Sequence, residues 1–321
     1  MKELNVLLCL NNACTFKCRM CQLWKKPLWE EDYISVEDCY KFIPTLKEFG
    51  EIPITVHIIG GEPFLEERCL ELVRFIAQQG FRSVITSNGY FIGEEMARRI
   101  TKSGLHTLNL SLESLNREVH DRLRGVRGSA EKVIRAIDYL KRFDSGLNLG
   151  INTIILRDNL DDIIELTEWV NQDDKLGYIY FMAVMQPFGS VPDSNWYQKD
   201  EFRLLWPDPG KVCLVLDRLK EMKAEGYKIG NPQTQLEVFK SYFSNPQLFV
   251  KKWECNLGRT ALNINVYGDV YLCFFMDCMG NIRQDRLKEL WYSAKADKVR
   301  EKIRNCRKNC ELLINCYYED I

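Results

Sequence analysis

Residues 1–184 repeat one pattern six times: a short run rich in β-branched residues, a turn, and a stretch with the hydrophobic period of a helix. The strand-like runs are residues 6–10, 54–59, 83–87, 107–112, 149–155 and 178–184. Apolar strands that alternate with helices predict a parallel sheet covered by helices. Six units are too few for a closed eight-stranded β/α barrel, so an open partial barrel or a doubly wound sheet is expected. In both architectures the chemistry gathers at the carboxyl ends of the strands.

The pattern changes after residue 184. Residues 186–210 contain four prolines and two glycines, which predicts an irregular connection. A helix is expected at residues 211–225, a β-hairpin at residues 260–274 and a further helix at residues 287–303. We therefore expect a barrel over residues 1–185, a bridging region over 186–250 and a small hairpin-and-helix domain over 251–321.

Cysteine is the unusual component of the composition, with 13 in 321 residues. The apolar run at residues 6–10 is too short for an export signal or a membrane span, so a cytoplasmic protein is expected. In that compartment thiols bind metal more often than they form disulfides. Lys and Arg number 44 against 45 Asp and Glu, and this net charge of −1 argues against a nucleic-acid or membrane partner.

Three of the cysteines come directly after the first predicted strand, where Cys14, Cys18 and Cys21 form the pattern C-x3-C-x2-C. Thiolates are soft ligands that suit zinc and iron–sulfur clusters. A structural zinc site takes four ligands, usually as two pairs, and no fourth Cys or His is nearby in the sequence. A [4Fe–4S] cluster held by three thiolates leaves one iron open to another ligand. The spacing therefore favours a reactive iron–sulfur centre.

This arrangement resembles the radical S-adenosylmethionine (SAM) enzymes, which implies a partial (β/α)6 barrel similar to a TIM barrel. A second motif agrees: Gly60-Gly61-Glu62-Pro63, after the second strand, is similar to the Gly-Gly-Glu-Pro segment of that family. The resemblance implies that this segment holds the amino group of SAM. Paired glycines permit close approach of the backbone to a ligand, and the carboxylate of Glu62 suits an ammonium group.

Polar residues at the ends of the next strands agree with the same family. Ser87 and Asn88 end the third strand, Ser111 and Glu113 end the fourth, and Asn152 lies on the fifth. The family commonly has Asp in place of Glu113. The resemblance implies that these residues contact SAM, whereas the structural alternative is that they only form turns.

The resemblance also implies a reaction. An electron passes from the cluster to the sulfonium of SAM, and cleavage gives methionine and a 5′-deoxyadenosyl radical, which takes a hydrogen atom from the substrate. The organic chemistry belongs to the cofactor, whereas the protein orients the reactants and excludes water. An electron donor such as ferredoxin or flavodoxin is the expected partner.

A second cysteine group resembles the auxiliary-cluster modules of radical enzymes, the SPASM domain and its shorter twitch form. It comprises two cysteines across the predicted hairpin and three near the end of the sequence: Cys255, Cys273, Cys306, Cys310 and Cys316. The resemblance implies one auxiliary [4Fe–4S] cluster. Cys255, Cys273, Cys310 and Cys316 are the first choice of ligands, and Cys306 is able to replace either of the last two. Four thiolates could also hold zinc, and Asp320 as an unusual ligand keeps a second auxiliary cluster open.

Two more cysteines are candidates for chemistry. Cys278 follows the hairpin closely and is a candidate ligand or redox thiol. Cys213 lies in a helical pattern that favours a small core residue, and it is also a candidate hydrogen-atom donor.

The resemblance predicts an enzyme that oxidises, epimerises or cross-links a peptide or a small molecule, with the auxiliary cluster accepting an electron or anchoring the substrate. A radical SAM enzyme that modifies nucleic acid is a second hypothesis, against which the net charge argues. A zinc protein without catalytic activity is a third, and analysis of iron and sulfide distinguishes it from the others.

Overall fold

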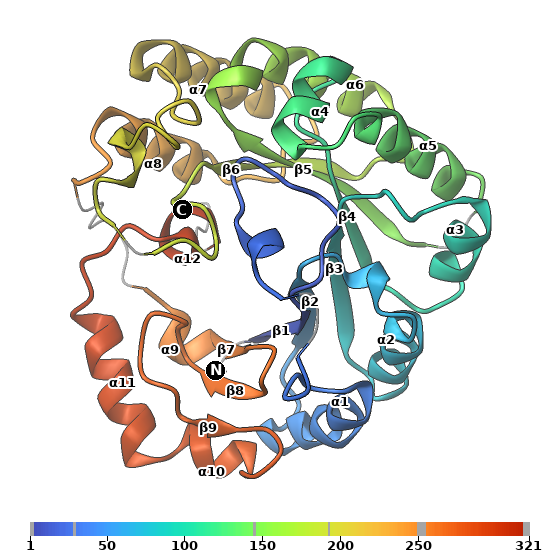
Figure 1. Ribbon diagram of the computed structural model, residues 1–321, viewed down its shortest axis with the longest axis vertical. Helices are drawn as coiled ribbons and strands as arrows, with labels where there is room; N and C mark the ends of the chain where they lie inside the picture. Colours follow the sequence, from blue (N-terminus) through green and yellow to red (C-terminus); the bar gives the residue numbers. More distant parts are fainter. Residues whose placement is uncertain (1–2, 28–29, 144–145, 192, 249–254, 317–321) are drawn as a thin grey trace.

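The computed structural model describes residues 1–321 apart from 1–2, 28–29, 144–145, 192, 249–254 and 317–321. All six predicted strands are present and pair in parallel in chain order (Figure 1). They are β1 (Leu4–Asn11), β2 (Ile54–Gly60), β3 (Arg82–Ser87), β4 (Thr107–Ser111), β5 (Asn148–Ile155) and β6 (Tyr178–Ala183). The strands form an arc in which β6 is the last member of the sheet, which confirms the predicted partial barrel.

Helices cover the outer face of this arc (Figure 1). They are α1 (Val36–Phe42), α2 (Cys69–Gln78), α3 (Glu94–Thr101), α4 (Arg117–Arg124), α5 (Ser129–Lys141) and α6 (Ile163–Gln172). Short 3-10 helices are η1 (Leu23–Lys25), η2 (Ile43–Phe49), η3 (Pro63–Leu65), η4 (Arg157–Asp162) and η5 (Trp196–Gln198). Local sequence sets the helix starts: Ser35 and Asp38 form a reciprocal capping box at the start of α1.

The predicted hairpin joins the barrel sheet directly. Strand β7 (Ala261–Ile264) pairs in parallel with β1, and β8 (Asp269–Tyr271) and β9 (Gly280–Asn281) continue the sheet in antiparallel order. The strand order is β6-β5-β4-β3-β2-β1-β7-β8-β9. Strand β1 therefore has the barrel on one side and the cysteine-rich end of the chain on the other.

The single helix predicted at residues 287–303 is two helices. They are α10 (Leu287–Trp291) and α11 (Ala294–Arg304), and a short helix α9 (Leu257–Thr260) precedes β7. The break is at Ser293, whose extended backbone and hydroxyl cap α11 by accepting a hydrogen bond from Ala296 N. A cap residue competes with helix continuation, which the apolar period alone does not reveal.

The bridging region and the end of the chain cover the outer edge of β6. The bridging region contains α7 (Pro209–Ala224) and α8 (Gln233–Ser244), and the last helix is α12 (Glu311–Asn315). The side-chain amide of Asn231 bonds to both the N–H and the C=O of Phe181, at 2.7 and 2.8 Å. Asn315 does the same to Ala183, at 2.8 and 3.1 Å. Two amide side chains thus take the place of a neighbouring strand.

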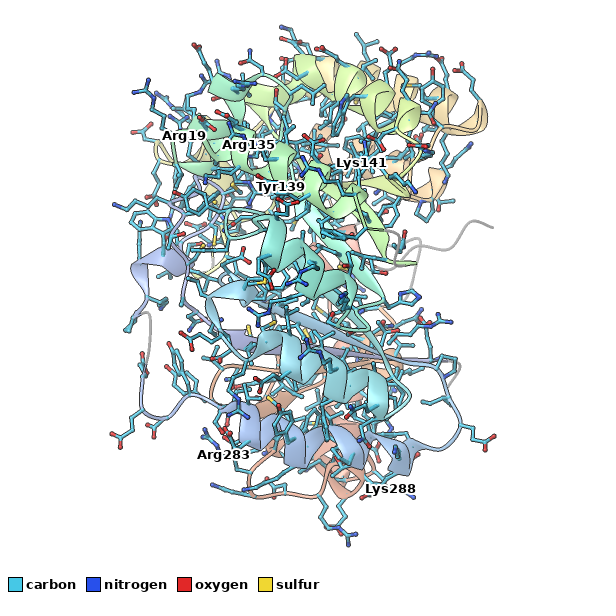
Figure 2. All side chains as sticks on the ribbon, turned by 90° about the vertical axis from the view of Figure 1, so that its right-hand side faces the viewer. Arg19, Arg135, Tyr139, Lys141, Arg283 and Lys288 are labelled. Carbon is cyan, nitrogen blue, oxygen red and sulfur yellow. The ribbon has the colours of Figure 1, made fainter. Side chains whose placement is uncertain are left out.

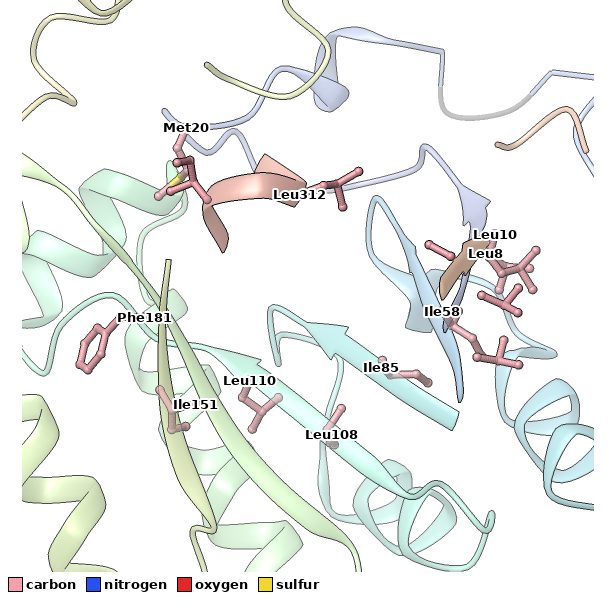
Figure 3. Close-up of a cluster of buried hydrophobic side chains, with 14 of the residues drawn as sticks. Leu8, Leu10, Met20, Ile58, Ile85, Leu108, Leu110, Ile151, Phe181 and Leu312 are labelled. Atoms are coloured by element: carbon pink, nitrogen blue, oxygen red, sulfur yellow. The ribbon is translucent and has the colours of Figure 1, made fainter. Parts of the chain in front are cut away.

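One continuous apolar core joins the barrel to both cysteine-bearing segments. Figure 3 shows Leu8, Ile58 and Leu110 of the strands together with Met20 of the loop after β1 and Leu312 of α12, and all five belong to the same buried cluster. Among the described residues, no helix has the length and apolar character that crossing a membrane requires.

Candidate active site

The first cysteine group lies in the loop that follows β1. Backbone N–H groups donate to two of its sulfur atoms, Phe16 N to Cys14 Sγ and Leu23 N to Cys21 Sγ, each at 3.4 Å. Burial is the main cause that raises the pKa of the Cys14 thiol to about 12, and the neighbouring Cys18 and Cys21 raise it further. Thiolates at this site therefore need a bound cationic centre, which an iron–sulfur cluster provides.

The Gly-Gly-Glu-Pro segment packs directly against this loop. Gly61 N donates to Asn11 O at 2.9 Å, and Glu62 N donates to Ala13 O at 2.7 Å. A Cβ atom on Gly61 would lie 2.0 Å from Ala13 O, a distance at which the two atoms would overlap. Only glycine therefore fits at this position. In the structure Gly61 lets the backbone approach Ala13, the residue before Cys14, and Gly60 lets it approach Asn11. Their close approach to a ligand stays a prediction.

The carboxylate of Glu62 is buried and accepts three hydrogen bonds. Ser87 Oγ and Phe64 N donate to Oε1, at 2.7 and 3.2 Å, and Asn88 N donates to Oε2 at 2.8 Å. Burial raises the pKa of Glu62, and these hydrogen bonds oppose the shift. Two oxygens offer about four acceptor positions, so roughly one remains for a further donor.

Arg124, the last residue of α4, links Cys18 to Glu113. Its Nη1 lies 3.9 Å from Cys18 Sγ, and its Nη2 forms an ion pair with Glu113 Oε1. Ile154 N donates to Glu113 Oε2 at 2.8 Å. Burial raises the pKa of Glu113, whereas the charge of Arg124 lowers it. A fixed positive charge thus faces one of the predicted cluster ligands.

The remaining predicted cofactor residues lie at the same edge of the sheet. Ser111 and Asn152 are in register across β4 and β5, and Pro63 begins the 3-10 helix η3 after Glu62. Because the strands are parallel, their carboxyl ends meet at the edge where β1 leads into the cysteine loop.

Four cysteines of the second group line one cavity of about 430 Å³: Cys255, Cys273, Cys306 and Cys310. Burial, with the nearby Cys255 and Cys306, raises the pKa of Cys273 to about 11. Phe275 N donates to Cys273 Sγ at 3.5 Å. In the described part of the chain, no three Cys, His, Asp or Glu side chains converge on the position of a single ion. The thiols surround a cavity, and this arrangement fits a cluster of several metal atoms.

The other predicted thiols lie elsewhere. Cys316 does not line the cavity. Cys278 donates to a backbone carbonyl two residues further on. Cys213 lies on α7, where its sulfur is 3.8 Å from a hydroxyl of α8. Asp320 lies outside the described residues.

Helix α12 lies between the two cysteine groups (Figures 1 and 3). It starts directly after Cys310, and burial together with the nearby Glu311 carboxylate raises the pKa of both Cys21 and Cys316. Glu311 is open to solvent, yet the surrounding protein raises the pKa of its own carboxyl by desolvation.

Neither Arg124 nor Glu311 belongs to a motif that predicts a site role from the sequence. Arg124 reaches Glu113 and Cys18 through space, across 11 and 106 positions of the chain. Such contacts leave no spacing signal in a single sequence. The one available hint is that an acid at position 113, buried after a strand, needs a cationic partner.

A parallel partial barrel with one thiol group at its mouth and a second around an adjoining cavity defines an iron–sulfur protein. Residues 8–170 match the family described as the radical SAM superfamily, and residues 255–317 match the SPASM iron–sulfur cluster-binding domain. The chain belongs to the radical SAM superfamily and carries a SPASM domain. Its cofactors are SAM and [4Fe–4S] clusters.

Relatives and solved structures agree with this assignment. The chain is 31% identical over 312 residues to the AdoMet-dependent heme synthase of Oleidesulfovibrio alaskensis, covering 88% of this chain and 72% of the relative. It is 26% identical over 252 residues to the Fe-coproporphyrin III synthase of Methanosarcina barkeri, covering 78% of this chain and 59% of the relative's length. The structure of Streptococcus suis SuiB has a TM-score of 0.70 at 18% identity, over 98% of this chain and 72% of SuiB.

These matches show that the chain is an enzyme, which removes the hypothesis of a zinc protein without catalytic activity. The likeness to SuiB, at 18% identity, shows the shared fold. The chain spans 59% of the length of the Fe-coproporphyrin III synthase and 72% of the length of the heme synthase.

Replacing Gly61 by Ala should release the first cluster, because its Cβ would push Ala13 and the cysteine loop away. We expect about half of the iron and sulfide to be lost per chain, with the auxiliary signal retained. The matched control is Gly93→Ala, where a Cβ meets nothing within 4 Å. Iron and sulfide analysis of both purified variants is the measurement, and full iron content in Gly61→Ala would contradict the role given to the glycine pair.

Replacing Arg124 by Gln should lower the midpoint potential of the first cluster, because a positive charge near a thiolate ligand favours the reduced form. Glu113→Gln should raise the potential, since it leaves the Arg124 charge uncompensated. Arg124→Lys keeps the charge and should lie closer to the wild type. A redox titration followed by electron paramagnetic resonance (EPR) gives the midpoint potentials. Shifts of the same sign in Arg124→Gln and Glu113→Gln would contradict the role given to the Arg124 charge.

Proposed function

We propose that this enzyme oxidises an organic substrate, a peptide or a small molecule, beside α12 and between its two cysteine groups. When bound, the first cluster supplies the electron that releases the adenosyl radical from SAM, and the auxiliary cluster takes up an electron that the substrate loses. The position of α12 carries the proposal, because Cys310 lines the second cavity while the charge of the next residue, Glu311, is near enough to raise the pKa of Cys21.

Around the first cluster, the chain's residues have separate tasks. Cys14, Cys18 and Cys21 are the proposed ligands. The SAM-binding residues are proposed to be those at the sheet edge beside them: Gly60, Gly61, Glu62, Pro63, Ser87, Asn88, Ser111, Glu113 and Asn152. The open acceptor position on Glu62 suits the ammonium group of SAM. Asn11 Oδ1 is a second candidate acceptor, since it is buried and has no hydrogen-bond partner among the described residues.

Around the auxiliary cluster, we propose that the ligands are the four cysteines that line the cavity, with Cys306 in place of Cys316. Three cationic residues on the same cavity wall, Arg304, Arg307 and Lys308, support thiolates there. Cys316, near the Glu311 carboxylate, is left to face the space between the two sites.

One carboxylate and the names of similar proteins indicate which substrates to test. The carboxylate of Glu311, whose charge acts on Cys21, favours a substrate with an amine or another hydrogen-bond donor close to the reacting carbon. Two relatives are named as synthases of heme and of Fe-coproporphyrin III. SuiB has a structure with its precursor peptide SuiA. A peptide and an iron tetrapyrrole are therefore the substrates to test first.

Reconstituted enzyme with dithionite and SAM should form 5′-deoxyadenosine slowly, and the rate should rise when the correct substrate is added. Changing Cys14, Cys18 and Cys21 together to Ala should abolish this product, while about half of the iron remains. Liquid chromatography with mass spectrometry measures 5′-deoxyadenosine and any substrate product that has lost two hydrogen atoms. Undiminished 5′-deoxyadenosine in the triple variant would refute the first-cluster assignment.

Two single variants separate the candidate ligand sets of the auxiliary cluster. Cys306→Ala should lose the auxiliary EPR signal and substrate oxidation, yet keep slow cleavage of SAM. Cys316→Ala should keep the auxiliary signal and about the full iron content. The opposite result, with the signal lost in Cys316→Ala and kept in Cys306→Ala, would restore the ligand set that the sequence favours.

A further inference from the structure

The loop that carries the first cysteine group is strongly basic, although the chain as a whole has a net charge of −1. Residues 13–27 contain four Lys or Arg and no Asp or Glu. Lys17, Arg19 and Lys25 are exposed. Among the described residues, no acidic side chain pairs with Lys17 or Lys25, so their charges face solvent.

Two of these charges gather at one indole ring. The ammonium groups of Lys17 and Lys25 lie over the ring of Trp24, at 5.9 and 5.4 Å from its centroid. Trp24 Nε1 in turn donates to Cys21 O at 2.9 Å. The aromatic ring beneath the charged surface is thus joined by one hydrogen bond to the backbone of a proposed cluster ligand.

The positive surface continues onto the neighbouring helices. Arg19 N donates to Leu123 O at 2.9 Å, which fixes the loop against α4. Arg19 and Arg122 share a single acid, Asp158, at 3.6 and 3.1 Å, so this contact leaves an excess of positive charge.

Beyond α4, Arg127, Lys132 and Arg135 line a small hollow at the start of α5 with one acid, Glu131, which Arg135 already engages. Figure 2 shows Arg19 and Arg135 toward one end of the molecule and Lys288 at the other. We call Lys17, Arg19, Lys25, Arg127, Lys132 and Arg135 the basic face.

We propose that the basic face docks an acidic protein that carries one electron, and that the electron enters at the Trp24–Cys21 contact. This inference rests on the proposed function, because reductive cleavage of SAM consumes an electron that the chain must receive from outside. The carrier is oxidised by one electron and the centre held by Cys14, Cys18 and Cys21 is reduced by one; no proton needs to move.

Charge complementarity supports this partner, because opposite charges steer two proteins into contact and fix their register. Position decides between an acidic protein and a nucleic acid, the other polyanion that a basic surface could take. The basic face borders the cysteine loop itself, which is where an electron carrier has to approach.

The test compares two reductants on the same loaded enzyme. Reduced flavodoxin, an acidic one-electron carrier, should support 5′-deoxyadenosine formation in the wild type, and added salt should slow that reaction. The double variant Lys17→Glu/Lys25→Glu should be slower with flavodoxin by about tenfold or more and unchanged with dithionite. Lys17→Arg/Lys25→Arg keeps the charge and should react like the wild type.

The matched control reverses two exposed lysines far from the basic face, Lys288→Glu/Lys298→Glu on α10 and α11, and should react like the wild type with both reductants. The binding of oxidised flavodoxin, followed by titration, should weaken only in the Lys17/Lys25 charge-reversal variant.

Equal flavodoxin rates in the wild type and Lys17→Glu/Lys25→Glu would overturn the docking surface while leaving the proposed function intact. Binding of a random-sequence RNA that the same variant loses, with an unchanged flavodoxin rate, would assign the face to nucleic acid instead. Absence of 5′-deoxyadenosine with dithionite in the wild type would refute the proposed function, and the docking surface with it.

Discussion

The open edge of β6 is the constraint on which the arrangement of the two cysteine groups depends. A parallel sheet that stops after six strands leaves N–H and C=O groups unpaired, and buried groups of this kind cost roughly 1–3 kcal/mol each. Here every second residue of that edge is satisfied in turn. Ile179 bonds to the backbone of residues 228–230, Phe181 to the amide of Asn231 and Ala183 to the amide of Asn315. Since Asn315 ends α12, the bond that closes the edge also fixes Cys310 and Glu311 near the first cysteine loop.

Strand β1 makes the second connection between the two sites. Its carboxyl end leads into the first cysteine loop, and its free side pairs with β7, which belongs to the cysteine-rich end of the chain. The two cysteine groups are therefore held by one sheet, with the last helix and β7 anchoring the tail at both ends of the arc. A geometry fixed in this way suits two redox centres that must keep a constant separation.

The sequence determines the barrel well and the site only in part. All six strands could be predicted, because each is a short apolar run between turn residues, and the cysteine spacing located the first group. The break at Ser293 could not, since the hydrophobic period runs through it and only the cap shows it. The choice between Cys306 and Cys316 depends on where α12 folds back, and α12 is placed by Asn315 on Ala183, a contact across 132 positions. The role of Arg124 cannot be predicted either, because its contact with Cys18 spans 106 positions of the chain. The spacing of residues in a sequence predicts contacts between neighbours along the chain. These residues meet through long-range hydrogen bonds and ion pairs, which form only when the sheet has folded.

The two buried carboxylates of the site follow one physical rule. Glu62 comes after β2 and accepts from Asn88 N, just beyond β3; Glu113 comes after β4 and accepts from Ile154 N of β5. Each acid thus satisfies an N–H group at the end of the adjacent strand and ties two strand ends together. A buried charge is costly unless fixed donors surround it, and both acids have them before any cofactor arrives. The carboxylates therefore act first on the protein, where they hold the edge of the sheet in place. The SAM site proposed at this edge is then a rigid rim with few free acceptors. Glu113 also fixes Arg124 beside Cys18, so the carboxylate that orders the edge of the sheet also holds a positive charge next to a proposed cluster ligand.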